Sequence, residues 1–152
     1  MILELNYQHL DYIKDILPFT KNGILIDTSV VKILLDGLIS LRISKRKSPE
    51  LNNLLSFLDF IKVNNKWNMF FITPHILTEV CNHLRKDYDK FRNYKEIITE
   101  ILPILKEMEE KPMDKNRILD SVNLKNPILE IGDISLFLVT DDFLTSSKKI
   151  SI

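Results

Sequence analysis

Short, continuous apolar runs alternate along the chain with longer segments in which apolar residues recur every three or four positions. The two clearest runs are Gly23–Asp27 and Trp67–Thr73, and each follows a turn that contains asparagine. Runs of this kind predict strands that are buried on both faces of a sheet. Helical spacing follows each of them, over residues 30–41 and 76–84. The alternation of strand and helix therefore predicts an α/β fold with a mostly parallel sheet.

The rest of the chain adds further helices to this pattern. Apolar positions predict a helix over residues 51–61 and a long one over Tyr94–Lys111, in which Pro103 predicts a kink or a break. A short helix is expected before Pro18, whereas the segment from Lys111 to Pro127 is polar and is expected to be irregular. The length of 152 residues, with no internal repeat, predicts that the whole chain forms a single domain.

Composition narrows the classes of protein to which the chain can belong. Hydrophobic residues make up 45% of the sequence, which is ordinary for a globular protein with a proper core. Lys and Arg number 21 and Asp and Glu 21, and this balance excludes a strongly basic protein that coats nucleic acid without specificity. The single cysteine, Cys81, excludes an internal disulfide and fits a reducing compartment, so we expect a cytoplasmic protein. The longest apolar runs are far shorter than the ~20 residues that span a bilayer, which predicts no membrane partner.

Acidic residues occur where the carboxyl ends of the predicted strands should meet. Asp27 ends the first strand, and Glu79 lies about one and a half turns into the helix that Thr73 and Pro74 begin after the second. Asp133 follows a glycine and precedes a strongly apolar stretch. Functional residues of open α/β sheets gather at this edge, so these three acids are candidates for a shared site.

Each of these acids also has an ordinary structural interpretation. Asp27 can form an Asx turn or cap the following helix, and Asp133 can cap a helix that begins at the next residue. Glu79 can be a surface residue that pairs with His75 or His83, four positions away on either side. The sequence leaves both kinds of interpretation open.

A second group of carboxylates, Asp141 and Asp142, follows the apolar stretch. Adjacent carboxylates repel each other unless solvent or a cation separates them, so a solvated turn and a metal site are the two interpretations. Three or four carboxylates at one sheet edge together indicate cations, and hard oxygen ligands select Mg²⁺ or Mn²⁺ over zinc. One or two such ions can activate water and stabilise the leaving oxygen in phosphodiester hydrolysis.

Three segments that carry these acids, ILIDTS, TPHILTEVCNHL and GDISLFLVTDD, resemble the PIN-domain family of metal-dependent nucleases. The resemblance covers residues 22–145 and implies a three-layer α/β/α sandwich with a central, mostly parallel sheet. It implies an endoribonuclease that cleaves RNA with Mg²⁺ or Mn²⁺. Because many bacterial members are VapC-type toxins that often dimerise, an antitoxin partner and a homodimer are also expected. The implied catalytic metal ligands are Asp27, Glu79, Asp133 and, assisting them, Asp142 or Asp141.

The C-terminal part departs from the family pattern, in which a last strand ends in Thr-x-Asp. Asp133 and Asp141 are only eight residues apart, too few for a helix, a loop and a strand. Either a helix begins at Ile134 and the final KKISI starts a strand that is cut short, or residues 134–142 are themselves the last strand. We favour the first interpretation, which predicts that the domain is truncated at its C-terminus.

The same residues also allow functions other than RNA cleavage. The absence of the last strand with its Thr-x-Asp end favours a PIN-like protein that has lost cleavage and binds RNA or protein. A receiver-like signalling domain needs paired acids directly after the first strand, which Asp27-Thr28-Ser29 does not supply. Basic residues within 42–47 and 85–92 are candidates for phosphate contacts that position a nucleic-acid backbone, with a solvated surface as the alternative.

Overall fold

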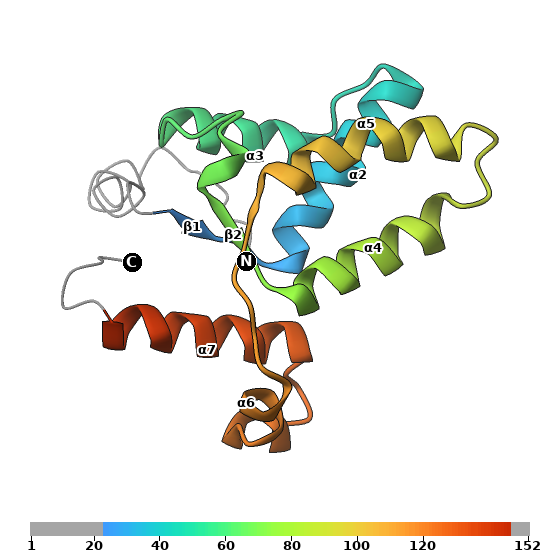
Figure 1. Ribbon diagram of the computed structural model, residues 1–152. Helices are drawn as coiled ribbons and strands as arrows, with labels where there is room; N and C mark the ends of the chain where they lie inside the picture. The colour runs from blue at the N-terminus through green and yellow to red at the C-terminus, as the bar shows by residue number, and fades with distance from the viewer. Residues whose placement is uncertain (1–22, 147–152) are drawn as a thin grey trace.

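The computed structural model describes residues 23–146, which form helices around a small parallel β-sheet (Figure 1). The α/β class predicted from the alternation of strands and helices is confirmed. The helix expected before Pro18 and the strand expected in the last five residues lie outside the described residues.

Three short parallel strands make up the sheet, and they lie side by side in chain order: β1 (Ile24–Leu25), β2 (Phe70–Ile72) and β3 (Glu109–Glu110). Leu25 pairs with Phe71, and Phe71 pairs with Glu109. Both predicted strands are shorter than expected, and a 3₁₀ turn, η3 (Trp67–Met69), occupies the first part of the second apolar run. The central strand β2 buries its first and last residues, whereas β1 is only partly buried, so burial of both its faces was a wrong expectation.

The third strand was not predicted, because the apolar spacing continues in helical phase to Met108 and the helix was expected to extend to Lys111. The helix α5 (Tyr94–Glu107) ends earlier, and Met108 adopts an extended backbone with φ −65° and ψ 139°. Met108 is buried, and beyond it the Lys111 N–H donates to the Ile72 carbonyl at 2.8 Å. The edge of β2 that faces away from β1 thus provides hydrogen-bond partners for these residues, which they could not reach if the helix continued. The predicted helix is therefore wrong in its last residues.

Two of the helices begin with a side-chain cap followed by proline, as was predicted for α4 (Pro74–Tyr88) but not for α3 (Pro49–Phe60), which begins two residues earlier than expected. Ser48 and Thr73 each accept a hydrogen bond from a backbone N–H three residues later, at 3.1 and 3.3 Å, and a proline occupies the next position. Pro103 lies inside α5 without ending it. The remaining helical elements of the described residues are α2 (Thr28–Ser44), α6 (Lys115–Leu119), the 3₁₀ turn η4 (Val122–Lys125) and α7 (Ile131–Ser146).

The last helix, α7, decides between the two C-terminal interpretations. Residues 134–142 are helical throughout, so they are not a last strand, and the favoured interpretation of this segment is confirmed. The short elements α6 and η4 lie in the segment that was expected to be irregular. Asp133 accordingly lies in the first turn of a late helix.

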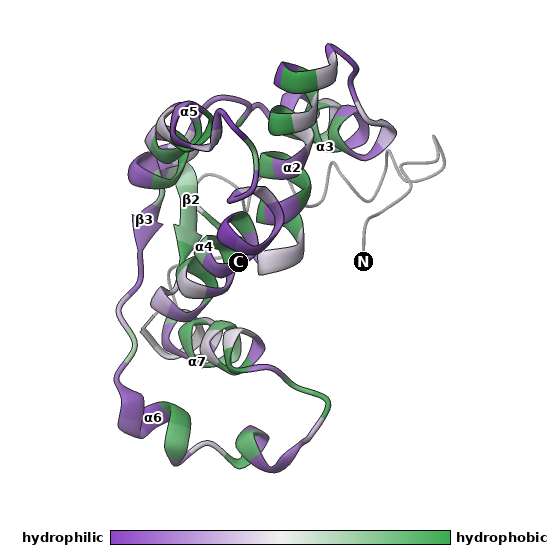
Figure 2. Cartoon of the chain, turned by 90° about the vertical axis from the view of Figure 1, so that its right-hand side faces the viewer, coloured by the Kyte–Doolittle hydropathy of each residue, from purple (hydrophilic) through white to green (hydrophobic). Residues whose placement is uncertain are grey.

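Helix α4 packs against both α2 and α7, and this contact positions the candidate site. In both views α3 and α5 lie towards one end of the molecule, and α6 and α7 towards the other (Figures 1 and 2). Figure 2 shows that β2 is apolar whereas β3, at the sheet edge, is hydrophilic. The rings of Trp67 and Phe70 lie 5.7 Å apart in the core. Among the residues that the structure describes, no helix has the length and apolar character needed to cross a bilayer.

Candidate acidic site

The carboxylate of Glu79 joins three helices. Glu79 lies in α4, and its Oε2 accepts a hydrogen bond from the Thr28 hydroxyl at the start of α2, at 2.6 Å. Its Oε1 accepts a hydrogen bond from the backbone N–H of Gly132 at the start of α7, at 3.2 Å. One partly buried side chain therefore holds the first turns of α2 and α7 against α4.

The other two predicted acids flank this junction. Asp27 occupies the N-cap position of α2 next to Thr28, and its Oδ2 accepts a hydrogen bond from the Ser29 hydroxyl at 2.5 Å. Asp133 follows Gly132, and its Oδ2 accepts a hydrogen bond from the Glu130 backbone N–H at 3.0 Å. Each acid is thus the immediate neighbour of a residue that contacts Glu79. Asp27 occupies the capping position of α2 but caps no backbone N–H. Asp133 lies inside the first turn of α7, which begins at Ile131, so the expected cap of a helix that begins at Ile134 is wrong.

The present side-chain positions do not form a metal cage. Within residues 23–146, no three acidic, histidine or cysteine side chains are grouped so that they could share one ion. Asp27 and Asp133 each use a carboxylate oxygen on a local donor instead. Their donor chemistry, all carboxylate and hydroxyl oxygen, is still that of a Mg²⁺ or Mn²⁺ site.

Gly132 is a site residue that the sequence analysis did not single out. A Cβ atom at this position would lie 2.7 Å from Glu79 Oε1 and 2.8 Å from Oε2, so any side chain would displace the carboxylate. The glycine therefore permits the hydrogen bond between its own N–H and Glu79. A glycine directly before an acid at a helix start was the available sequence signal.

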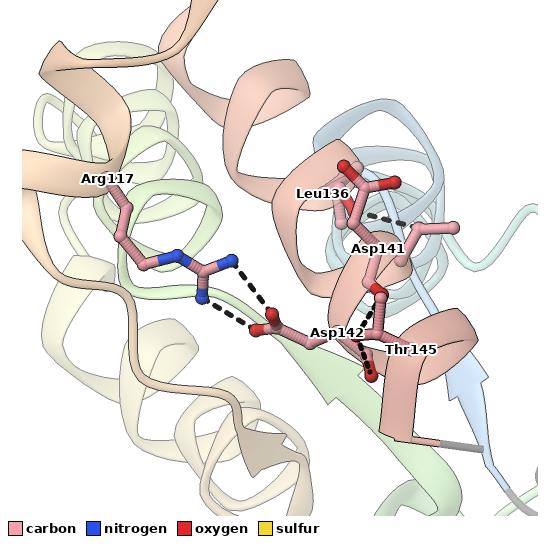
Figure 3. Close-up of polar contacts among 6 residues, drawn as sticks. Arg117, Leu136, Asp141, Asp142 and Thr145 are labelled. Atoms are coloured by element: carbon pink, nitrogen blue, oxygen red, sulfur yellow. Dashed lines mark hydrogen bonds and ion pairs between the residues drawn. The ribbon is translucent and has the colours of Figure 1, made fainter.

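Asp142, the fourth predicted ligand, lies away from this junction. It is nine residues after Asp133 on the same helix, which corresponds to about 13 Å along the axis. Its two carboxylate oxygens accept hydrogen bonds from Arg117 of α6 at 2.7 and 2.8 Å, whereas Asp141 points away from this pair (Figure 3). The hydrogen bond to Asp142 raises the pKa of Arg117 above its ordinary value. The structure thus gives Asp142 an ion pair that ties α6 to α7.

A cleft of about 580 Å³ continues along α2 from Ser29. Its wall includes Asp36, whose carboxylate accepts a hydrogen bond from the Tyr88 hydroxyl at 2.6 Å and lies 2.8 Å from His83 Nε2. The other ring nitrogen of His83 faces Asp87 at 3.3 Å. The alternative pairing of Glu79 with His83 is therefore wrong, because that ring is held between two aspartates. These contacts join residues about 50 positions apart, which no sequence motif indicated.

Raising the pH above about 10 is expected to destabilise the protein through Tyr88. Burial, and after it the hydrogen bond to Asp36, raises the pKa of Tyr88 well above its ordinary value of 10.0. The unfolded phenol then loses its proton while the native one keeps it, so the free energy of unfolding falls as the pH rises. Tyrosinate absorbance should show a late ionisation step, and Tyr88→Phe should remove this step. Simultaneous ionisation of all tyrosines in the native protein would contradict the prediction.

Comparison with known proteins adds no assignment to the acidic junction. No protein-family model, curated protein or solved structure gives a significant match to the chain. The function of the junction is therefore inferred from its own geometry and from the three motifs that carry its acids.

Proposed function

We propose that the protein is a metal-dependent endoribonuclease of the PIN type, with the three-layer arrangement of that family. Its Mg²⁺ or Mn²⁺ site would be formed by Asp27, Glu79 and Asp133. The observation that carries this proposal is the position of Glu79, which is hydrogen-bonded to the neighbour of each of the other two acids. A VapC-like role with an antitoxin and a homodimer remain predictions from the resemblance, and a cytoplasmic location remains a prediction from the single cysteine.

The residues at the junction fit a hard divalent cation by their chemistry. Asp27 and Asp133 would exchange their bonds to the Ser29 hydroxyl and the Glu130 N–H for the ion, while Thr28 and Gly132 keep Glu79 in place. The bound ion would supply an activated water and charge stabilisation for phosphodiester hydrolysis. We leave Asp142 outside this site, because it is paired with Arg117.

A second candidate function is supported by the same carboxylate. Both oxygens of Glu79 already have protein donors, an arrangement that suits a structural tie between helices without any metal. The protein would then be a PIN-like module that binds RNA or protein without cleaving it. The two candidates differ in whether a divalent cation binds at the junction.

Cleavage assays and thermal unfolding with Mn²⁺ distinguish the candidates. With a panel of single-stranded and hairpin RNA oligonucleotides, we expect cleavage that requires Mn²⁺ or Mg²⁺ and a melting temperature that Mn²⁺ raises. Asp27→Asn keeps the size of the side chain but removes the charge, and it should lower the rate by more than the ~10–100-fold that loss of a supporting outer-shell residue costs.

The matched control is Asp89→Asn, which removes an exposed carboxylate from the end of α4 and should leave the rate unchanged. RNA binding without cleavage, together with a melting temperature that Mn²⁺ does not change, would establish the binding module instead. Cleavage that survives both EDTA and Asp27→Asn would rule out the proposed mechanism.

A further inference from the structure

A buried line of hydroxyl groups connects the start of α4 with the start of α7. Thr73 and Ser135 are both 0% exposed, and they are the only buried polar or charged residues in the described part of the chain. Their hydroxyl oxygens lie 2.6 Å apart. The Thr73 oxygen accepts a hydrogen bond from the Ile76 N–H at 3.3 Å, and the Ser135 hydroxyl donates to the Gly132 carbonyl at 2.6 Å.

Which of the two hydroxyls donates to the other follows from the number of protons that each one carries. A hydroxyl carries one proton, and that of Ser135 is used on the Gly132 carbonyl. The proton between the two hydroxyls therefore belongs to Thr73, which donates to Ser135. Each hydroxyl then donates once and accepts once, so both buried groups are satisfied.

The line ends at the acidic junction. Gly132 accepts from Ser135 with its carbonyl and donates to Glu79 with its N–H, so both polar groups of this residue are fixed. Thr73 and Glu79 belong to the same end of α4, and the hydrogen bonds form a closed ring between that helix and the first turn of α7. Asp133 is the next residue on that turn.

Helix capping accounts for only one of the two hydroxyls. Thr73 caps α4 by itself. Ser135 lies past the start of α7, where a hydroxyl bonded back to a carbonyl adds little to helix stability. An alanine would fill this buried position without a polar group, so the serine hydroxyl requires another reason.

We propose that Thr73 and Ser135 are positioning residues of the acidic site, which set the place of Gly132 and Asp133 relative to Glu79. This inference rests on the proposed metal site. The two hydroxyls touch neither the ion nor the RNA. They act by fixing the peptide from which Asp133 extends and the N–H that holds Glu79.

The test measures how much Mn²⁺ each variant needs, in two independent readouts. One is the Mn²⁺ concentration that gives half of the maximal rise in melting temperature, and the other is the concentration that gives half-maximal RNA cleavage. Ser135→Ala should raise both by about tenfold or more, as for loss of outer-shell support, with a rate at saturating Mn²⁺ close to that of the wild type. Thr73→Ser keeps the cap and the line, and it should resemble the wild type.

Two further variants separate positioning from general stability. Val63→Ala removes buried volume in the loop after α3 and should melt earlier without needing more Mn²⁺. Ser135→Cys puts a slightly larger thiol, a weak donor, in place of the hydroxyl, so it should give an intermediate Mn²⁺ requirement even if Ser135→Ala does not fold.

An unchanged Mn²⁺ requirement in the folded Ser135 variants, beside a wild type that responds to Mn²⁺, would overturn the positioning role alone. A wild type that does not respond to Mn²⁺ in either readout would overturn the metal site and, with it, this role.

Discussion

Replacing Gly37 with valine (Gly37→Val) is expected to lower the free energy of unfolding by about 3 kcal/mol. Gly37 is buried where α2 packs against α3, and a Cβ atom there would lie 2.7 Å from the Cβ of Leu51. Leu51 is 0% exposed, and its Cβ cannot rotate away because it is fixed to the α3 backbone. The two helices would have to move apart, which opens the core around them.

The measurement is urea unfolding followed by the fluorescence of Trp67, which is the single tryptophan of the chain and is 8% exposed. Ser40→Val is the matched control, because it places the same side chain on the same helix at an exposed position. It should change the free energy of unfolding by no more than about 0.5 kcal/mol. Equal stability of the two variants would show that α2 and α3 do not meet at Gly37.

Local signals in the sequence predicted those parts of the fold that local chemistry decides. Thr73 and Pro74 cap and open α4 whatever the helix packs against, and the apolar spacing after Asp133 belongs to a helix in the structure. The helix expected over Tyr94–Lys111 was wrong after Glu107, because the residues that follow pair with β2, where the Lys111 N–H donates to the Ile72 carbonyl. Pairing between distant segments has no signature in either segment alone.

The candidate site also has features that local sequence predicts and features that depend on contacts between distant segments. Asp27 follows a strand, Glu79 lies about one and a half turns into α4, and Asp133 lies in the first turn of α7. The order of elements was therefore enough to predict that the three acids lie near the same helix starts. The ion pair of Asp142 could not be predicted, because Arg117 lies 25 residues earlier in a short helix of its own. The contact of Gly132 with Glu79 required the packing of α7 on α4, which periodicity does not specify.

Removing the carboxylate of Glu79 is expected to lower the free energy of unfolding by about as much as Gly37→Val does. Glu79→Ala leaves the Thr28 hydroxyl and the Gly132 N–H without their ionised acceptor. Hydrogen bonds to charged groups each contribute about 1.5–3 kcal/mol, and water replaces part of this, so unfolding should become easier by about 2–4 kcal/mol. Glu107→Ala, on the exposed last turn of α5, is the control and should stay within about 0.5 kcal/mol of the wild type.

A double-mutant cycle with Gly132→Ala locates the origin of this loss. In the wild type, the added methyl group would displace the Glu79 carboxylate and break its hydrogen bonds, which should cost about 1–2 kcal/mol. In the Glu79→Ala background no carboxylate remains near that methyl group, so Gly132→Ala should cost almost nothing. The coupling free energy between the two sites should therefore exceed about 1 kcal/mol. Strictly additive costs would mean that Glu79 and Gly132 do not meet in solution, and neither the metal site nor the hydroxyl line could then be as described.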